Sequence, residues 1–215
     1  MMSKKLPYKD EMVIRSFGIP DIRAVDEGSF IEGHAAVFEQ KTNIGDWFYE
    51  IIERGAFNEC DFDDVLFTAN HNLWEIPLAR SRRNNSNSTL QLNVDDRGLY
   101  IKANLDVSEN AEARSLLSSV KRGDINGMSF IFWVKEERWE GLDTDMPTRH
   151  VVKVARVREV SAVNFPAYPG TDITARDQSA LENAKRALEN VRSTLENEKN
   201  EREALRLKAN ILLKG

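Results

Sequence analysis

Short segments of β-type sequence follow one another along most of the chain, from residue 12 to about residue 175. Residues 88–94 and 99–107 alternate apolar and polar side chains on either side of the turn sequence DDRG, which predicts a β-hairpin. Residues 34–40 and 47–53 are also strand-like. The regular spacing of βαβ units is missing. We therefore expect an α+β fold that is mainly β, in which mixed or antiparallel strands form a closed or nearly closed barrel surrounded by helices.

A helix is predicted within this β-rich region, at residues 108–123. Asp106 or Ser108 is the expected N-terminal cap, because a short polar side chain can accept hydrogen bonds from the first backbone N–H groups of a helix. The helix is expected to end at Gly123. At helical spacing, one face of this segment carries Ala113, Leu116, Leu117 and Val120.

The chain changes character after Thr174, where a long segment has no glycine or proline until the final residue. We expect residues 177–215 to form an amphipathic helix, with residues 12–176 as the folded domain and residues 1–11 as an N-terminal arm. The apolar stripe of this helix consists of Leu181, Ala184, Leu188, Val191 and Leu195. The stripe lapses at residues 198–202, so both a two-stranded coiled coil and a helix packed on a neighbour stay open.

Composition argues against several classes of function. The net charge is -5 and acidic and basic residues are interspersed, so the basic cluster at residues 78–83 is interpreted as a solvated loop. No apolar run approaches the roughly 20 residues that span a bilayer. No paired cysteines or histidines indicate a metal site, and no glycine-rich phosphate loop indicates a cofactor. We therefore expect no nucleic-acid or membrane partner, no metal and no cofactor.

The single cysteine, Cys60, fits a reducing compartment because it cannot form an internal disulfide. Acidic residues surround it, and negative charges raise the pKa of a thiol. We interpret Cys60 as a small, half-buried side chain and not as a nucleophile.

Three histidines are candidates for a general base, which needs a near-neutral pKa and a nucleophile within reach. His71 ends an apolar strand and is followed by polar residues, as expected of a side chain at the rim of a barrel. His34 and His150 begin strands, and we interpret them as exposed or hydrogen-bonded structural residues.

Ser129 follows an Asn-Gly turn and lies among large apolar residues in the segment INGMSFIFWV. It is interpreted in two ways, as a small polar residue on the wet face of a strand or as a nucleophile. A serine hydroxyl becomes a nucleophile when an adjacent base takes its proton and a third group orients that base. The sequence offers candidates for all three roles.

Glu159 is the candidate for the third role. In a strand over residues 157–163 it shares a face with apolar neighbours, and a buried carboxylate usually has a partner because desolvation of an unpaired charge is costly. That partner is either an arginine, such as Arg156 or Arg158, or His71. The spacing does not decide between them.

Five segments, in chain order, carry a resemblance to a known family: GHAAVFEQ, ERGAF, ANHN, LDVSENAEARSLLSSVKRGDINGMSFIFWV and VREVSAVNFPAYPGTDITAR. The chain resembles the prohead proteases of tailed phages, the capsid maturation proteases whose fold is similar to that of the herpesvirus protease assemblin. The resemblance covers about residues 12–176, which would be the protease domain. Its most specific parts are NGMSF after a helix and EVSAVNFPAY.

The resemblance implies a serine-type catalytic triad. It places the nucleophile on Ser129, the base on His71 and an acidic third member on Glu159, where assemblin has a second histidine. Many relatives have glycine two residues after the serine, whereas this chain has Ile131. Backbone N–H groups in residues 164–168 are the expected oxyanion donors.

The activity implied is that of a serine endopeptidase that cleaves a capsid scaffold or a capsid-protein propeptide, and itself, during prohead maturation. Its partners would be the major capsid protein precursor or a scaffold protein, and a homodimer would match assemblin. It would act in the host cytoplasm, inside the immature procapsid. Two alternatives stay open: an inactive capsid assembly or scaffold protein with the same fold, and a small β-barrel module that binds peptide or nucleic acid.

Overall fold

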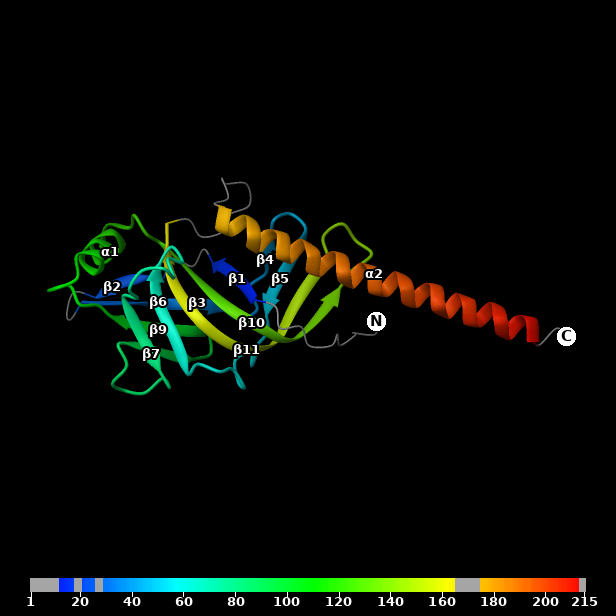
Figure 1. The fold of residues 1–215 in the computed structure, drawn as a ribbon, viewed down its shortest axis with the longest axis horizontal. Coiled ribbons are helices and arrows are strands. Elements are labelled where there is room, and N and C mark those ends of the chain that lie inside the picture. The colour runs from blue at the N-terminus through cyan, green and yellow to red at the C-terminus, as the bar shows by residue number, and fades with distance from the viewer. Residues whose placement is uncertain (1–11, 18–20, 26–28, 165–174, 213–215) are drawn as a thin grey trace. The chain divides into compact units, whose positions relative to one another are not determined.

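The computed structural model describes residues 12–17, 21–25, 29–164 and 175–212, in two units that lie within residues 1–173 and 174–215. The described part of the first unit contains eleven strands and one helix (Figure 1). Its elements are β1 (Met12–Phe17), β2 (Arg23–Val25), β3 (Phe30–Val37), β4 (Thr42–Ile44), β5 (Phe48–Ile52), β6 (Asp64–Ala69), β7 (Ala79–Arg82), β8 (Leu90–Val94), β9 (Gly98–Asn104), α1 (Ala111–Arg122), β10 (Gly127–Glu140) and β11 (Thr148–Val163). The second unit contains α2 (Ala175–Leu212).

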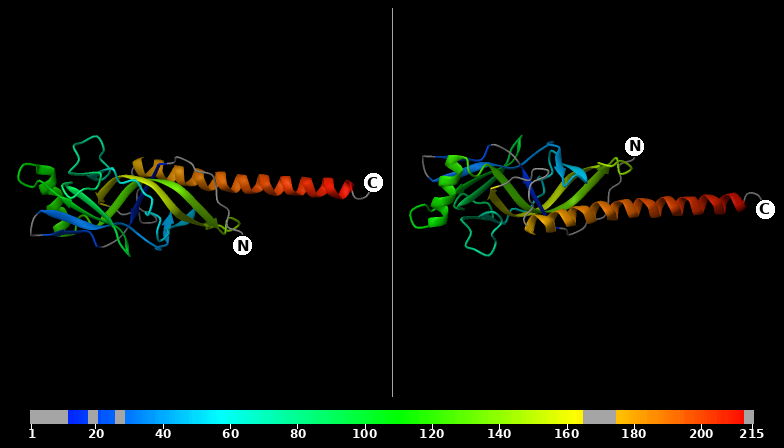
Figure 2. Two further views of the ribbon diagram at one scale, coloured as in Figure 1. Left: turned by 90° about the horizontal axis from the view of Figure 1, so that it is seen from below. Right: turned by 90° about the horizontal axis from the view of Figure 1, so that it is seen from above.

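The hairpin of β10 and β11 is the centre of a seven-stranded sheet with the order β1-β10-β11-β5-β4, in which β6 also pairs with β11 and β7 pairs with β6. The two central strands are 14 and 16 residues long, run antiparallel and bend along their length (Figure 2). Their pairing shifts register at several points, one of them between Ile131 and Phe132, and such irregularities bend a strand. β5 and β6 pair in parallel with opposite ends of β11.

A second, antiparallel sheet of four strands has the order β2-β3-β9-β8. The hairpin predicted around the DDRG turn is confirmed, because β8 and β9 are antiparallel neighbours on either side of it. Leu90 and Leu92 are buried whereas Gln91 is exposed, as expected of a strand with one face on the core.

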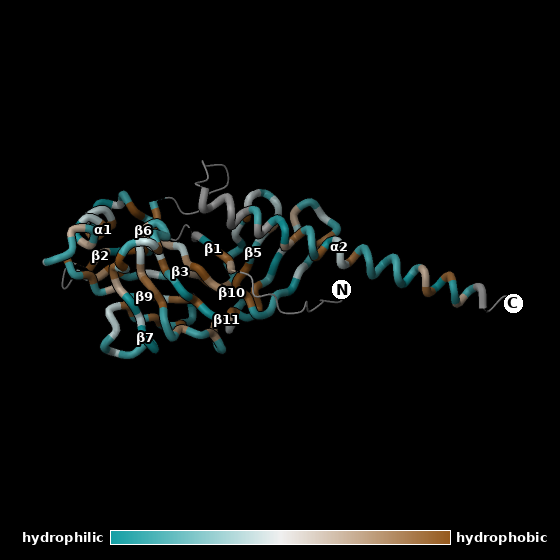
Figure 3. Tube along the Cα trace, viewed as in Figure 1, coloured by the Kyte–Doolittle hydropathy of each residue, from teal (hydrophilic) through white to brown (hydrophobic). Residues whose placement is uncertain are grey.

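Apolar side chains from both sheets and from α1 form one core. The rings of Phe130 and Phe132 stack with 4.4 Å between their centroids, and both side chains are fully buried, as is Ile101 of β9. Burial of one such side chain contributes about 1.5–3 kcal/mol to the free energy of folding. Figure 3 shows hydrophobic residues along β3, β9, β10 and β11, whereas the residues of α2 are mainly hydrophilic.

The expected closed barrel is not confirmed. Within the described residues, no strand of the seven-stranded sheet pairs with a strand of the four-stranded sheet, and both sheets end in edge strands. Alternation of apolar and polar residues arises both when two sheets pack face to face and when one sheet closes into a barrel. The alternation in the sequence therefore could not distinguish a barrel from two packed sheets. The mainly β class with two helices, one of them C-terminal, is confirmed.

Helix α1 has a different N-cap from the one expected. The N-cap is Asn110. Its side-chain oxygen accepts hydrogen bonds from the backbone N–H groups of Glu112, at 2.9 Å, and Ala113, at 3.2 Å. Asp106 instead closes the preceding turn, where it accepts from the N–H of Glu109 at 3.1 Å. Gly123 ends the helix in a left-handed conformation, as predicted, and the four apolar residues predicted to share a face are buried.

Helix α2 is 38 residues long, which confirms the long C-terminal helix. Glu182 and Arg186 form an ion pair one turn apart, at 3.7 Å, and the side chains of Leu205 and Leu207 are largely exposed. The domain boundary at residues 176 and 177 and the coiled coil stay predictions. In the part of the chain that the structure describes, neither helix is apolar over a length that would cross a membrane.

Candidate active site

His71 lies just beyond the end of β6, at a sharp turn of the backbone. Asn70 and His71 have φ angles of 50° and 55°, in the left-handed region that asparagine adopts readily and histidine adopts at a cost. Two hydrogen bonds to β11 hold the turn: the N–H of Asn70 donates to the carbonyl of Ala162, and the N–H of His71 donates to Oγ of Ser161, both at 2.9 Å. The turn thus fixes the imidazole beside β11.

Ser129 lies on β10 and has no exposed surface, so its interpretation as a polar residue on a wet strand face is wrong. Its Oγ atom is 2.5 Å from Nε2 of His71. The same hydroxyl also donates to the backbone carbonyl of Arg15, at 2.9 Å. Because a hydroxyl carries one proton, His71 and Arg15 compete for it.

Glu159 lies on β11 with 1% of its surface exposed, and its Oε2 atom is 2.7 Å from Nδ1 of His71. The two arginines that were the alternative partners have other contacts. Arg156 lies over the ring of Trp133 at 4.1 Å, and Arg158 donates to the carbonyl of Asp64 at 3.4 Å. The geometry therefore favours the histidine over the arginines as the partner of Glu159.

Two hydroxyl groups that the sequence interpretation missed hold the other oxygen of Glu159. Thr68 donates to Oε1 of Glu159 at 2.5 Å, and Ser161 donates to the same oxygen. Thr68 and Ser161 lie directly opposite each other in the parallel pairing of β6 with β11, with 2.7 Å between their hydroxyl oxygens. The sequence contains a signal for Ser161, which shares a strand face with Glu159, but none for Thr68.

The hydrogen-bond partners favour one tautomer of His71. Glu159 accepts from two hydroxyl groups, and with the same carboxylate as the acceptor from His71, Nδ1 would carry the proton of that contact. Nε2 then has a lone pair directed at Oγ of Ser129. This tautomer is the one that a histidine needs to take a proton from serine. The structure thus brings together, from β10, β11 and the turn after β6, the three side chains singled out in the sequence.

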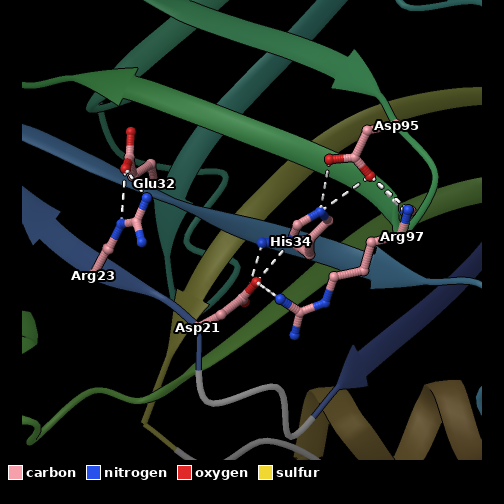
Figure 4. Close-up of polar contacts among 7 residues, drawn as sticks. Asp21, Arg23, Glu32, His34, Asp95 and Arg97 are labelled. Atoms are coloured by element: carbon pink, nitrogen blue, oxygen red, sulfur yellow. Dashed lines mark hydrogen bonds and ion pairs between the residues drawn. The ribbon is translucent and has the colours of Figure 1, made fainter.

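His34 is bound differently, between two carboxylates (Figure 4). Its Nδ1 atom is 2.6 Å from Asp21, and its Nε2 atom is 3.0 Å from Asp95 in the turn between β8 and β9. Arg97 forms a further ion pair with Asp21 at 2.9 Å. His34 is buried, as a hydrogen-bonded structural residue can be, and it links three separate segments of the chain.

His150 and Cys60 are also placed away from this arrangement. His150 pairs with Glu53 at 3.0 Å, which fits a structural histidine. Cys60 is half-buried, and burial, with a smaller contribution from the charge of Asp61, raises the pKa of its thiol to about 12. A thiol with this pKa is a poor nucleophile. Among the described residues, no group of three or more His, Cys, Asp or Glu side chains could hold a metal ion.

Comparison with known proteins identifies the family. The sequence model described as Caudovirus prohead serine protease matches residues 20–186, well over half of the chain. The chain belongs to this family. The resemblance to prohead proteases stated from the sequence is therefore confirmed. No curated protein matches the sequence. Among solved structures, the bacteriophage T4 capsid assembly protease, gp21, is similar over 71% of this chain and 97% of that chain, with 15% identity and a TM-score of 0.42.

The prohead protease family consists of serine peptidases of capsid maturation, and the chain is therefore assigned to this class. In this prohead protease the expected oxyanion donors stay a prediction, because residues 165–168 lie outside the described residues. The backbone N–H of Asn164, which is described, donates to Oδ1 of Asn70 at 3.1 Å. That bond joins the end of β11 to the turn that carries His71.

Proposed function

We propose that this chain is an endopeptidase with a Ser-His-Glu triad, formed by Ser129, His71 and Glu159. The observation that carries the proposal is the continuous line of hydrogen bonds between the three side chains, with 2.5 Å from Ser129 to His71 and 2.7 Å from His71 to Glu159. Hydroxyl, imidazole and carboxylate in this order are the groups that activate a serine for acyl transfer.

The geometry supports the following steps. Nε2 of His71 takes the proton of Ser129 as Oγ attacks the carbonyl carbon of a peptide bond, and it then gives this proton to the leaving amine. Glu159 holds the imidazole in place and stabilises its positive charge. Thr68 and Ser161 fix the carboxylate by their hydrogen bonds to Oε1, so that Oε2 stays directed at the histidine. Water then hydrolyses the acyl-enzyme ester.

The substrate we propose is the scaffold or the propeptide of the major capsid protein, cleaved inside the immature shell in the host cell, together with the protease itself. Confinement in a closed shell raises the effective concentration of protease and substrate, so cleavage does not require tight binding. A homodimer is a further expectation, by analogy with assemblin.

Co-expression with a capsid protein precursor and a scaffold protein tests this function. We expect the wild-type chain to produce shortened capsid or scaffold bands on a gel, and Ser129→Ala to abolish them. Ser86→Ala, in an exposed loop, is the matched control and should leave all processed bands in place. If Ser129→Ala leaves the bands unchanged, the chain is better explained as a non-enzymatic assembly factor with the same fold.

A further inference from the structure

The edge strand β1 lies directly beside Ser129. It pairs antiparallel with β10 in a register that sets Ser16 opposite Ser129. The carbonyl oxygen of Arg15 is 2.9 Å from Oγ of Ser129, and a C=O bond is about 1.2 Å long, so the carbonyl carbon lies within about 4.1 Å of Oγ. The carbonyl group of the peptide bond between Arg15 and Ser16 is thus held against the serine.

Strand β10 would be an open sheet edge without β1, because its other neighbour within the described residues is β11. An open edge presents unpaired N–H and C=O groups, with which an extended peptide can pair as an added strand. A substrate bound in this way would lie where β1 lies. Ser129 has no exposed surface and its hydroxyl is bonded to a carbonyl group of β1, so β1 must move before such a substrate can reach the serine.

The side chain of Arg15 is anchored in a buried acidic pocket. Its Nε and Nη2 atoms donate to the two carboxylate oxygens of Glu50 at 2.6 and 2.9 Å, and only 6% of Arg15 and 2% of Glu50 is exposed. Burial alone raises the pKa of Glu50, but Arg15 and Arg149 outweigh it and lower this pKa below its ordinary value. Glu50 is therefore held as a carboxylate, which a guanidinium can bind through two parallel hydrogen bonds.

Without Arg15, the ion pairs around Glu50 would contain two carboxylates and one cation. Arg149 lies between two carboxylates, with 3.2 Å to Glu50 and 2.7 Å to Glu137. Among these ion pairs, Arg15 is the second cation that balances the two acids. A buried charge that loses its partner is costly, so the vacated pocket would favour another guanidinium.

Strand β1 lies outside the region that the family model matches, which begins at residue 20. Glu50, Arg149 and the three triad residues all lie inside that region. The pocket therefore belongs to the family domain, whereas its occupant belongs to a preceding segment. A binding site inside the family domain and a bound strand outside it are what we expect if the strand can be removed.

We propose that β1 is the first substrate of this protease: Arg15 takes the position of the residue whose carbonyl is attacked, and Glu50 forms the pocket that selects its side chain. External substrates would then be extended peptides with arginine at the same position. The proposal rests on the proposed function, because it requires Ser129 to act as the nucleophile.

The bond changes are those of peptide hydrolysis. Oγ of Ser129 forms an ester with the carbonyl carbon of Arg15, and the serine proton passes through His71 to the nitrogen of Ser16 as the C–N bond breaks. Water then hydrolyses the ester, which leaves a carboxyl group on Arg15 and a free amino group on Ser16. The released segment includes Met12–Arg15, most of β1, and its departure opens the edge of β10.

Intact-mass measurement of the purified full-length chain tests the self-cleavage. We expect the wild-type chain to lose its first 15 residues and to begin at Ser16, whereas Ser129→Ala keeps the intact N-terminus. Arg15→Glu should retain the bond between residues 15 and 16, because its carboxylate would face Glu50. A wild-type chain that cleaves capsid protein but never this bond would overturn the inference and leave the proposed function standing. A chain that cleaves nothing and does not react with a fluorophosphonate, a serine-directed probe, would instead overturn the proposed function.

Two synthetic peptides test the pocket. One has the sequence of residues 10–20, DEMVIRSFGIP, and the other has leucine in place of Arg15. We expect kcat/KM for the arginine peptide to be about 100-fold higher with the wild-type chain, because leucine leaves the buried carboxylate unpaired. Glu50→Gln should lower this ratio at least about tenfold, Glu50→Asp should restore part of it, and the exposed Glu59→Gln should leave it unchanged. Equal cleavage of the two peptides by the wild-type chain would overturn the pocket assignment even if the Glu50 variants fail to fold.

Discussion

Nδ1 of His71 lies 2.7 Å from Oε2 of Glu159, although 88 residues separate them in the sequence. The parallel pairing of β6 with β11 accounts for this proximity. It sets Leu66 opposite Glu159 and Ala69 opposite Ala162, so the chain leaves β6 next to the acid-bearing strand. The left-handed turn at residues 70 and 71 then directs the imidazole back toward Glu159 and Ser129.

Replacement of Glu159 by glutamine tests the importance of this contact. The amide keeps the shape of the side chain but removes the negative charge that, in the proposed triad, orients and stabilises the imidazole, so we expect the turnover number for capsid precursor to fall at least about 100-fold. The urea midpoint of unfolding should change far less than it does on truncation to alanine. Glu109→Gln, at an exposed site before α1, is the matched control and should retain full turnover. Unchanged turnover in Glu159→Gln would exclude Glu159 from the proposed triad.

Thr68→Val tests the hydrogen bonds behind the acid. Valine fills nearly the same volume but cannot donate to Oε1 of Glu159, so the carboxylate loses one of the two hydroxyl groups that hold it. We expect kcat to fall about tenfold while KM changes little, by analogy with the loss seen when a hydrogen bond that orients a metal ligand is removed. Thr194→Val in α2, where the hydroxyl donates only to a helix carbonyl, should not change kcat. A rise in KM with constant kcat would instead indicate a substrate contact.

Local features of the fold were predictable from the sequence, whereas the arrangement of strands was not. The β8–β9 hairpin and the end of α1 at Gly123 depend on a few neighbouring residues, whose turn and cap chemistry is visible in the sequence. The N-cap was wrong because three short polar residues, Asp106, Ser108 and Asn110, compete within five positions. The pairing of β1 with β10 joins residues more than 100 positions apart, and no local pattern specifies it.

The candidate site likewise has residues that were predictable from the sequence and residues that were not. Ser129, His71 and Glu159 were identified by their chemistry and by resemblance to the prohead proteases, and the structure brings them into contact. Thr68 was missed because a threonine in a β-strand is ordinary, and its role depends on the register of a parallel pair. Arg15 was missed because it lies outside the segments that carry the resemblance.

Cys60 should be slow to react in the folded chain. Burial, and to a lesser degree the charge of Asp61, raises the pKa of its thiol to about 12, from an ordinary value of 9.0. The thiolate fraction near pH 8 is then roughly 1,000-fold lower than in the unfolded chain. We expect alkylation by iodoacetamide to be at least about 100-fold slower in the native chain than in urea, as followed by intact mass. Cys60→Ser should retain processing activity, and loss of activity in this variant would reopen the cysteine as a catalytic candidate.

Asp95 should stabilise the fold in a pH-dependent way through its contact with His34. Burial raises the pKa of Asp95, but bonds from the N–H groups of Gly98 and Arg97 and the contact with His34 lower it below its ordinary value of 3.8. A lowered pKa means that the stabilisation is complete above about pH 3.8 and disappears as pH falls through the lower, folded-state value. The urea midpoint of Asp95→Asn should therefore be below that of the wild type near pH 6, and this gap should narrow below pH 3.8. Asp96→Asn, at an exposed neighbouring site, should show no such gap. A gap that widens on acidification would contradict the assignment.

Among the described glycines Gly33, Gly55, Gly98, Gly123 and Gly141, we expect substitution by alanine to be most destabilising at Gly98. A Cβ atom at this position would overlap the carbonyl oxygen of Ala36 and lie 3.0 Å from Cα of Val37, both of which are backbone atoms of the paired strand β3. Because backbone cannot move aside as a flexible side chain can, we expect Gly98→Ala to lower the free energy of unfolding by about 2 kcal/mol or more. Gly123→Ala is the matched comparison: apart from its own chain neighbours, no atom lies within 4 Å of its Cβ position, and the cost of about 1 kcal/mol comes from its φ of 77°. Urea unfolding of the two variants checks the order, and a larger loss in Gly123→Ala would show that β9 does not approach β3 this closely.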